Sequence, residues 1–437
     1  MEWYWAAAIL FGCGVGFMML GIPVAISFFA TNLIAALLFM GGERGLWQII
    51  NNGFGAMTNF ALVPIPMFLL MGEFFYHTGL ATRFFNAVDK LMGNVPGRLA
   101  YVTLIGGTAF AGPAGSSMGA CALLGSLMVP EMMKRGYNKY LSMGPIMGVG
   151  GLAVIIPPSA LTVLLATLGQ TDVGDLLIAG VIPGLVLAIM YGVLIWGWTL
   201  HDPAAAPRYV AETVSTREKW RLILMDVVPM VGVIVFSVVI MIVGWATPTE
   251  AAALGALSVL LLAAAYRLLT WRAFKKSVDG ALRVTVMSFL VIFGSATFAQ
   301  VLAFTGSSSG LVGYLLAFDV TPMVMLMIMI GIILFLGCFM DQLSMMMLTA
   351  PIFFPLAKTL GFDLTWFGLI MLLALEIGYT TPPFGLLLFV MKGVAPPGTT
   401  MRDVYLAGAP FIACVMLLIA MIIMFPPLAT WLPRFSH

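Results

Sequence analysis

Charged residues are scarce in this sequence. Asp, Glu, Lys and Arg make up only 9% of its 437 residues, while 62% are hydrophobic. A soluble globular domain carries about 25% charged residues, so this chain has too few charges to cover a water-facing surface. We therefore expect the lipid bilayer to be its outer solvent, and we expect no nucleic acid partner.

Cysteine and histidine are also rare. The four cysteines lie far apart in apolar sequence, which fits neither a disulfide framework nor a metal site, and three histidines argue against a histidine-based metal centre. The motif G-x-x-x-x-G-K-[ST] is missing, so the sequence offers no chemistry for ATP hydrolysis. The N-terminus lacks a basic segment before its first apolar run, so no cleavable signal peptide is expected.

What the sequence has instead is a series of long apolar runs. A helix needs about 20 apolar residues to cross the hydrocarbon core. Single spans are predicted at residues 4–20, 23–40, 54–78, 140–169, 176–200, 222–244, 248–266, 284–305, 366–391 and 404–430. Two longer apolar stretches cover residues 99–131 and 322–356.

Positive charge is unevenly placed along the chain. Of the 20 Lys and Arg residues, 17 fall on one side of the predicted membrane, and only Arg44, Lys358 and Arg434 fall on the other. Cytoplasmic loops accumulate Lys and Arg, so the side with 17 is predicted to be cytoplasmic. Residues 270–283 are basic with interleaved apolar residues, which predicts an amphipathic helix lying in the interface.

The apolar stretch 99–131 has basic residues near both ends, so both ends are predicted to be cytoplasmic. Its middle, residues 112–117, has the helix-breaking sequence GPAGSS. The stretch therefore predicts a re-entrant hairpin. The alternative is two full spans with a tight outer turn, although each arm then has only about 16 residues, slightly short for a crossing.

The two halves of the sequence resemble each other at a fixed offset. Gly112, Pro130 and the pair Pro157-Pro158 all recur 225 residues later, the pair as Pro382-Pro383. Each half has five predicted spans and one hairpin, and because five is odd the second half is inverted in the membrane. The sequence thus predicts an all-α integral membrane protein of two inverted repeats, each with about five transmembrane helices, one re-entrant helical hairpin and a broken helix at the midplane.

These repeats set the expected domain organisation. The first repeat is expected over residues 1–200, a cytoplasmic linker over 201–221 and the second repeat over 222–437, with hairpins at 99–131 and 322–356 and broken helices around 155–159 and 380–383. Paired prolines remove two backbone donors and break a helix. The freed backbone groups at the midplane can bind ions and anionic substrates. A pure packing role for the proline kinks is the alternative, and the matched positions favour a binding site.

Several motifs give the chain a family resemblance over essentially its whole length. They are Gly115-Ser116-Ser117, Pro130-Glu131-Met132 followed by Lys134-Arg135-Gly136-Tyr137, Ile156-Pro157-Pro158-Ser159, Ala246-Thr247-Pro248-Thr249-Glu250-Ala251-Ala252 and Thr381-Pro382-Pro383-Phe384-Gly385. With them the sequence resembles the large membrane subunit of tripartite ATP-independent periplasmic (TRAP) transporters, within the ion transporter superfamily.

The resemblance implies an elevator-type carrier in the inner membrane of a bacterium or archaeon, driven by a sodium gradient and without an organic cofactor. It also implies two protein partners: a small four-helix membrane subunit and a soluble periplasmic binding protein that delivers a small organic anion of carboxylate or sulfonate type. The sequence has no N-terminal extension that could be the small subunit, so we expect that subunit to be a separate polypeptide.

Candidate site residues come from the hairpins and the broken helices. Substrate contacts are expected from Ser116, Ser117, Ser159, Thr380 and Thr381, and sodium ligands from Gly115, Ser116, Asp341, Ser344, Glu376 and Thr380. A carboxylate at membrane depth is costly unless it is paired or coordinated. Asp341 can therefore hold a cation, or it can cap a hairpin helix. Glu376 is four residues before Thr380, so both lie on one helix face.

Two other functions compete with a TRAP subunit. A stand-alone ion-coupled anion carrier of the same superfamily would need no binding protein. A membrane enzyme is suggested only by residues 115–119, which match G-x-S-x-G literally. A hydrolase of that kind needs a strand before the serine and a histidine base near it, and the sequence predicts neither. We therefore expect a transporter and not an enzyme.

Overall fold

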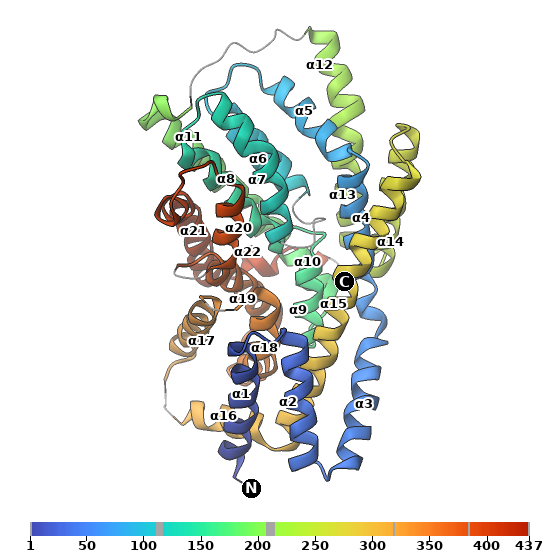
Figure 1. The fold of residues 1–437 in the computed structure, drawn as a ribbon, viewed down its shortest axis with the longest axis vertical. Helices are drawn as coiled ribbons and strands as arrows, with labels where there is room; N and C mark the ends of the chain where they lie inside the picture. Colours follow the sequence, from blue (N-terminus) through green and yellow to red (C-terminus); the bar gives the residue numbers. More distant parts are fainter. Residues whose placement is uncertain are drawn as a thin grey trace.

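The computed structural model describes residues 2–110, 117–206, 215–317, 320–338, 340–382 and 385–435, and every regular element among them is a helix (Figure 1). Helices bond their own N–H and C=O groups, so they remain stable where lipid is the solvent. In this part of the chain six helical segments are long and apolar enough to cross a membrane, and a bent helix pair makes a seventh candidate.

The helices pack as two groups. The first helix group consists of α1 (Trp3–Met19), α2 (Val24–Phe39), α3 (Glu43–Met57), α4 (Pro64–His77), α13 (Val228–Ile242), α14 (Pro248–Ala265), α15 (Trp271–Phe304) and α16 (Ser307–Leu316). The second consists of α6 (Arg98–Phe110), α7 (Ser117–Lys134), α8 (Lys139–Ile155), α9 (Ala160–Leu168), α10 (Val173–Ala179), α11 (Val181–His201), α17 (Pro322–Gly337), α18 (Gln342–Thr359), α19 (Leu364–Tyr379), α20 (Leu386–Val394), α21 (Met401–Met424) and α22 (Pro427–Thr430). Two short helices, α5 (Leu80–Met92) and α12 (Thr216–Leu222), precede α6 and α13.

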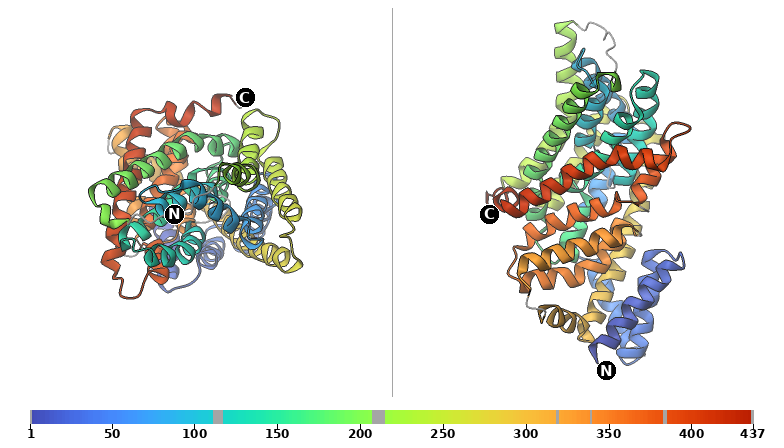
Figure 2. Two further views of the ribbon diagram at one scale, coloured as in Figure 1. Left: turned by 90° about the horizontal axis from the view of Figure 1, so that it is seen from above. Right: turned by 90° about the vertical axis from the view of Figure 1, so that its left-hand side faces the viewer.

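The long helix α15 is the main contact between the groups. It packs along α2, α3 and α4 in its own group and touches α9 and α18 in the other. Figure 1 shows α15 with α3, α4 and α14 on the right of the molecule and α17, α19 and α21 on the left. Figure 2 shows the same division from above. The two halves of the sequence are therefore interleaved in both groups.

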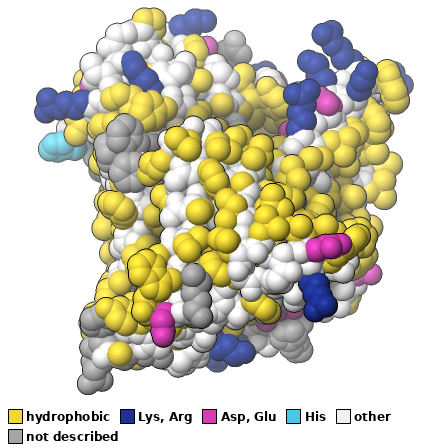
Figure 3. Space-filling view, turned by 60° about the horizontal axis from the view of Figure 1, so that its bottom comes forward, with side chains coloured by type: hydrophobic (Ala, Val, Ile, Leu, Met, Phe, Trp, Pro, Cys, Tyr) yellow, Lys and Arg dark blue, Asp and Glu magenta, His cyan; other side chains and the backbone are white. Residues whose placement is uncertain are grey.

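The outer surface matches the bilayer environment that the composition predicts. Figure 3 shows hydrophobic side chains over the middle of the visible face, with Lys and Arg gathered mostly at its upper edge. Large apolar side chains such as Ile189, Trp196 and Val235 are exposed on helices that could cross the membrane. Such exposure is costly in water and favourable in lipid.

Residues 271–283 are helical, as the sequence predicts, and their place in the membrane interface stays a prediction. The basic segment is the first part of α15, which continues without a break to Phe304. Small buried residues at four-residue spacing, Ala273, Ser277 and Ala281, form one face of this part. There the Ser277 Oγ donates to the Glu73 carbonyl of α4 at 3.0 Å. The segment therefore packs against a neighbouring helix, which fixes it in line with the span that follows.

The predicted span at residues 54–78 is also divided differently in the structure. Helix α3 ends at Met57, and α4 begins at Pro64 after a short 3-10 turn at Phe60–Leu62. Most of α3 lies before the predicted span. This helix contains polar residues such as Glu43, Gln48 and Asn51, so its sequence has no long apolar run that would predict it. Its buried glycine Gly53 lets the Phe293 ring of α15 pack directly against its backbone.

The helices place the predicted hairpins and breaks as follows. Helices α6 and α7 cover the stretch 99–131, and α17 and α18 cover 322–356. Helices α8 and α9 meet at a bend of 47° around Pro157-Pro158. Helix α19 ends at Tyr379 and α20 begins at Leu386, on either side of Pro382. The re-entrant path of the hairpins and the inverted relation of the halves stay predictions.

Candidate functional site

A buried carboxylate on α19 lies where the two predicted hairpins meet. Glu376 is only 2% exposed. Its Oε2 accepts a hydrogen bond from Ser117 Oγ at 2.8 Å and another from the side-chain amide of Gln342. Ser117 is the first residue of α7 and Gln342 is the first residue of α18. One oxygen atom therefore joins the starts of helices from the two halves of the chain.

Gln342 is a site residue that the sequence interpretation missed. It stands 225 residues after Ser117, which is the offset of the internal repeat. The repeat could have identified it, because residues at equivalent positions of two inverted halves face a common axis. Applied to Glu376, the same offset leads to Gly151 on α8. A Cβ built on Gly151 would lie 3.6 Å from Glu376 Cγ, so these two positions also face each other.

Asp341 caps helix α18. Its Oδ1 accepts from the Ser344 backbone N–H at 3.0 Å, and its Oδ2 accepts from Ser344 Oγ at 2.5 Å. The capping role considered from the sequence is therefore present, and it places the predicted ligand pair Asp341 and Ser344 in direct contact. Asp341 also lines two cavities.

Hydroxyl groups bond to backbone carbonyls at both helix breaks. Thr380 Oγ1 donates to the Glu376 carbonyl at 2.9 Å, and Thr381 Oγ1 donates to the Ile377 carbonyl at 2.5 Å. At the other break, Ser159 Oγ donates to the Val154 carbonyl at 2.8 Å. The Glu376 and Ile377 carbonyls also accept from the Thr380 backbone N–H, whereas the Val154 carbonyl stands four residues before Pro158, which has no N–H. A carbonyl freed inside a membrane protein needs such a partner. These three hydroxyls thus stabilise the breaks, and their oxygen lone pairs remain available to a cation.

Two cavities adjoin this site between the helix groups. One, of about 230 Å³, is lined by the starts of α7, α9 and α18, by α15 and by the Tyr379 end of α19. The other, of about 800 Å³, has Asp341, Ser344 and Arg283 of α15 among its lining residues. Ligand pockets commonly have volumes of about 300–1,000 Å³ with a few polar groups. The larger cavity is thus wide enough for a small organic molecule.

The polar groups of this site are carboxylates, hydroxyls and an amide. Within the described residues no cluster of three or more His, Cys, Asp or Glu could hold a metal ion. Carboxylates, hydroxyls and carbonyls of broken helices are the ligands that coordinate sodium in carriers of this kind of architecture. The predicted residues Gly115 and Ser116 lie outside the described residues, as do Pro383 and Phe384.

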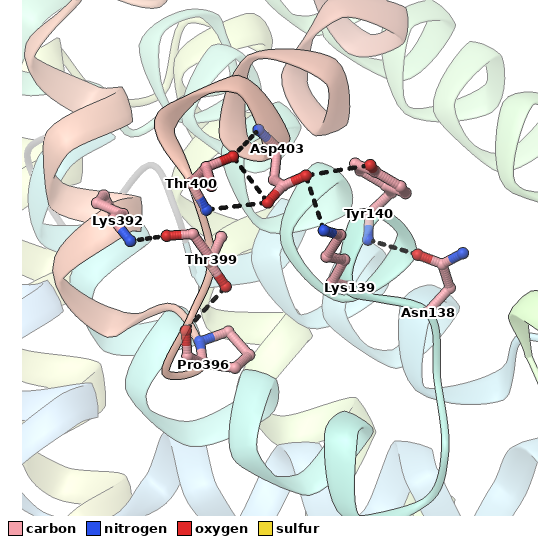
Figure 4. A network of polar contacts seen from close by, with 8 residues as sticks. All are labelled: Asn138, Lys139, Tyr140, Lys392, Pro396, Thr399, Thr400 and Asp403. Carbon is pink, nitrogen blue, oxygen red and sulfur yellow. Dashed lines mark hydrogen bonds and ion pairs between the residues drawn. The ribbon is translucent and has the colours of Figure 1, made fainter.

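A second polar network fixes helix α8, which packs beside Glu376. The Asp403 carboxylate at the start of α21 accepts from Lys139 Nζ at 2.7 Å and from Tyr140 OH at 3.1 Å. It also accepts from the Thr400 N–H at 2.9 Å, which completes a capping box on α21 (Figure 4). The first residues of α8 and α21 are thus bound to each other, which sets the position of Gly150 and Gly151 against α19.

Comparisons with known proteins give one consistent family. The family described as "Tripartite ATP-independent periplasmic transporter, DctM component" matches residues 11–428. The chain is 31% identical to the C4-dicarboxylate TRAP transporter large permease protein DctM of Pseudomonas aeruginosa, covering 87% of this chain and 88% of that protein. It is 29% identical to the sialic acid TRAP transporter large permease protein SiaM of Vibrio cholerae, with 96% of both chains covered.

A solved structure shares the fold at low sequence identity. The antimetabolite efflux pump MtrF of Neisseria gonorrhoeae matches with a TM-score of 0.62 at 14% identity, covering 92% of this chain and 94% of that one. At this identity the likeness supports the fold and gives no information about the transported compound.

Proposed function

Because the chain belongs to the family of TRAP transporter large membrane subunits, we propose that it is the translocating subunit of a sodium-coupled carrier for a small organic anion. The protein is a multi-pass protein of the bacterial inner membrane. The proposal concerns the coupling ion, the class of substrate, the mechanism and the partners of this particular chain.

One observation carries the proposal of ion coupling. Glu376 is buried, and it is paired with no Lys, Arg or His among the described residues. An isolated negative charge at membrane depth is costly, and a coupling cation beside it would supply the missing positive charge. The cation ligands that we propose are Asp341, Ser344, Glu376 and Thr380, together with Gly115 and Ser116.

The proposed substrate is a carboxylate or a sulfonate. Two relatives are named for C4-dicarboxylate and sialic acid, and both compounds are acids. The 800 Å³ cavity could hold a compound of that size, and its lining includes Arg283, which is ion-paired with Asp279 at 3.0 Å. Substrate contacts are assigned to Ser116, Ser117, Ser159, Thr380 and Thr381, whose hydroxyls can bind an anionic group.

The division into two helix groups supports an elevator mechanism. The site lies on the second helix group, and the cavities beside it lie at the contact with α15 of the first. Movement of the second group along α15 would expose the site to each side of the membrane in turn. We propose that a small four-helix membrane subunit and a periplasmic binding protein complete the transporter, as the family name and the relatives suggest.

The experiment is uptake by the purified protein in proteoliposomes, with the small subunit and binding protein from neighbouring genes supplied. Radiolabelled ligand of that binding protein should accumulate when an inward sodium gradient is imposed, with no ATP present. Accumulation that needs ATP, or that is the same with and without a sodium gradient, would overturn the proposal. A carrier that works fully without the binding protein would identify a stand-alone transporter instead.

A further inference from the structure

A small space adjoins Glu376. It has a volume of about 20 Å³ and lies between α8, α11, α19 and α21. Its lining includes Gly151 of α8, Tyr191 of α11 and Thr380 after α19, and its other walls are apolar. A space that accommodates one water needs about 10–15 Å³ by this kind of measure. The space therefore fits one small molecule.

Two buried polar atoms in its lining residues lack a partner among the described residues. They are Oε1 of Glu376 and the hydroxyl oxygen of Tyr191. Both side chains are almost completely buried, at 2% and 1% exposed. A buried polar group without a hydrogen bond costs about 1–3 kcal/mol. Two such atoms, on two residues that line one space, are therefore costly unless a bound molecule bonds to them.

Both side chains lie close to Gly151 of α8. A Cβ built on Gly151 would lie 3.3 Å from the Tyr191 hydroxyl and 3.6 Å from Glu376 Cγ. The glycine thus leaves free the space that both side chains border. On the next residue, a Cβ built on Gly150 would lie 2.9 Å from Glu376 Oε1 itself. Helix α8 has no side chain at these two positions, because both are glycine.

We propose that one water molecule is bound in this space and links Tyr191 to Glu376. The Tyr191 hydroxyl donates to the water, and the water donates to Glu376 Oε1. Apolar cavities of this size stay empty, but a polar one with two or more partners holds water as part of the fold. Thr380 also lines the space and can supply a third partner.

Through this water, Tyr191 acts on the Glu376 carboxylate without contacting it directly. The carboxylate would then be held on both oxygens, by Ser117 and Gln342 on Oε2 and by the water on Oε1. Tyr191 is therefore a positioning residue for the group that joins α7 to α18. This role in transport rests on the proposed function, whereas the water site itself does not.

Two single variants remove the water in different ways. Tyr191→Phe deletes the donor and keeps the ring. Gly151→Ala keeps the hydroxyl and fills the space with a methyl group that meets its neighbours at 3.3 Å or more. Tyr101→Phe is the control, because it also removes a tyrosine hydroxyl, from a half-buried residue whose hydroxyl donates to the Gly192 carbonyl next to Tyr191 on α11. All variants are prepared as the full transporter complex.

The first measurement is structural and independent of transport. A high-resolution structure of the wild-type complex should show one ordered water between Tyr191 and Glu376, and Gly151→Ala should lack it. The midpoint of thermal unfolding should fall in each single variant, and the double variant should be no less stable than either one, because a single water can be lost only once. Additive losses, or a space that is dry in the wild type, would overturn the water site.

The second measurement is the sodium concentration for half-maximal uptake. It should rise by about twofold to tenfold in Tyr191→Phe and in Gly151→Ala, as for the loss of one hydrogen bond, and it should be unchanged in Tyr101→Phe. Unchanged sodium dependence in both variants, with the water shown to be lost, would refute the positioning role. Absence of sodium-dependent uptake in the wild type would refute the proposed function and leave the structural test standing.

Discussion

Replacement of Glu376 by Gln separates the charge of this residue from its shape. The side chain keeps an oxygen that can accept from Ser117 and Gln342. A hydrogen bond to a charged group contributes about 1.5–3 kcal/mol and one between neutral groups about 0.5–1.5 kcal/mol. The two bonds would thus lose about 2 kcal/mol together. Removal of a buried charge returns part of its desolvation cost, so we expect the folded protein to stay nearly as stable as the wild type.

The effect on the ion should be much larger than the effect on folding. A cation that loses a full negative partner in a low-dielectric site loses about 1.5–3 kcal/mol, or about tenfold to over a hundredfold in affinity. Glu376→Gln should therefore raise the sodium concentration for half-maximal uptake by at least about tenfold. The assay is sodium-dependent uptake in proteoliposomes with the partner proteins supplied, alongside the midpoint of thermal unfolding.

The control is the same change, Glu to Gln, at a position outside the site. Glu250→Gln changes a carboxylate of the capping box that begins α14, where it accepts from the Thr247 N–H at 2.8 Å. It should leave sodium dependence unchanged. A Glu376→Gln protein that folds and transports with the sodium dependence of the wild type would refute the reasoning, because the carboxylate would then need no cation.

Three further predictions concern other parts of the molecule. Asp341→Asn keeps an Oδ1 that can cap α18 and removes the charge, so the protein should fold while its sodium requirement rises by about tenfold or more; an unchanged requirement would leave Asp341 as a cap only. Cysteines placed at Lys134 and Lys358 should react with an impermeant reagent from opposite sides of the membrane, and labelling from one side would rule out the inverted repeat. Asp403→Asn should lower the midpoint of thermal unfolding, because Lys139 loses its ion pair, and a second change, Lys139→Met, should then lower it little further.

The sequence predicted the parts of this fold that depend on strong local signals. The break between α8 and α9 follows from two prolines that cannot donate, and the apolar runs identify most of the long helices. The remaining features of the fold depend on packing between helices, which the sequence does not show directly. The basic first part of α15 is amphipathic. Its sequence alone does not show that it packs against α4 as part of the same helix as the span that follows. The polar helix α3 has no apolar run to reveal it.

The site was predicted in outline and incompletely in detail. Ser117 and Glu376 were named, and the structure brings them into contact. The sequence favours Asp341 over Gln342 because Asp341 carries a charge at membrane depth. In the structure the side-chain amide of Gln342 is the group that donates to Glu376. The empty space beside Gly151 could not be predicted, since it depends on how four helices pack and not on any residue type.

The unequal pair formed by Gly151 and Glu376 has a consequence for how the two halves of the chain can change over time. A duplicated ancestor with identical halves would carry the same residue at both positions. Two carboxylates facing each other in the bilayer would repel, and two glycines would remove the carboxylate that Gln342 bonds to and leave Ser117 only the Gly150 carbonyl. The two positions therefore supply different things, a carboxylate at Glu376 and space at Gly151. A chimera built from two copies of either half should for this reason lack a working centre, even if all its helices form.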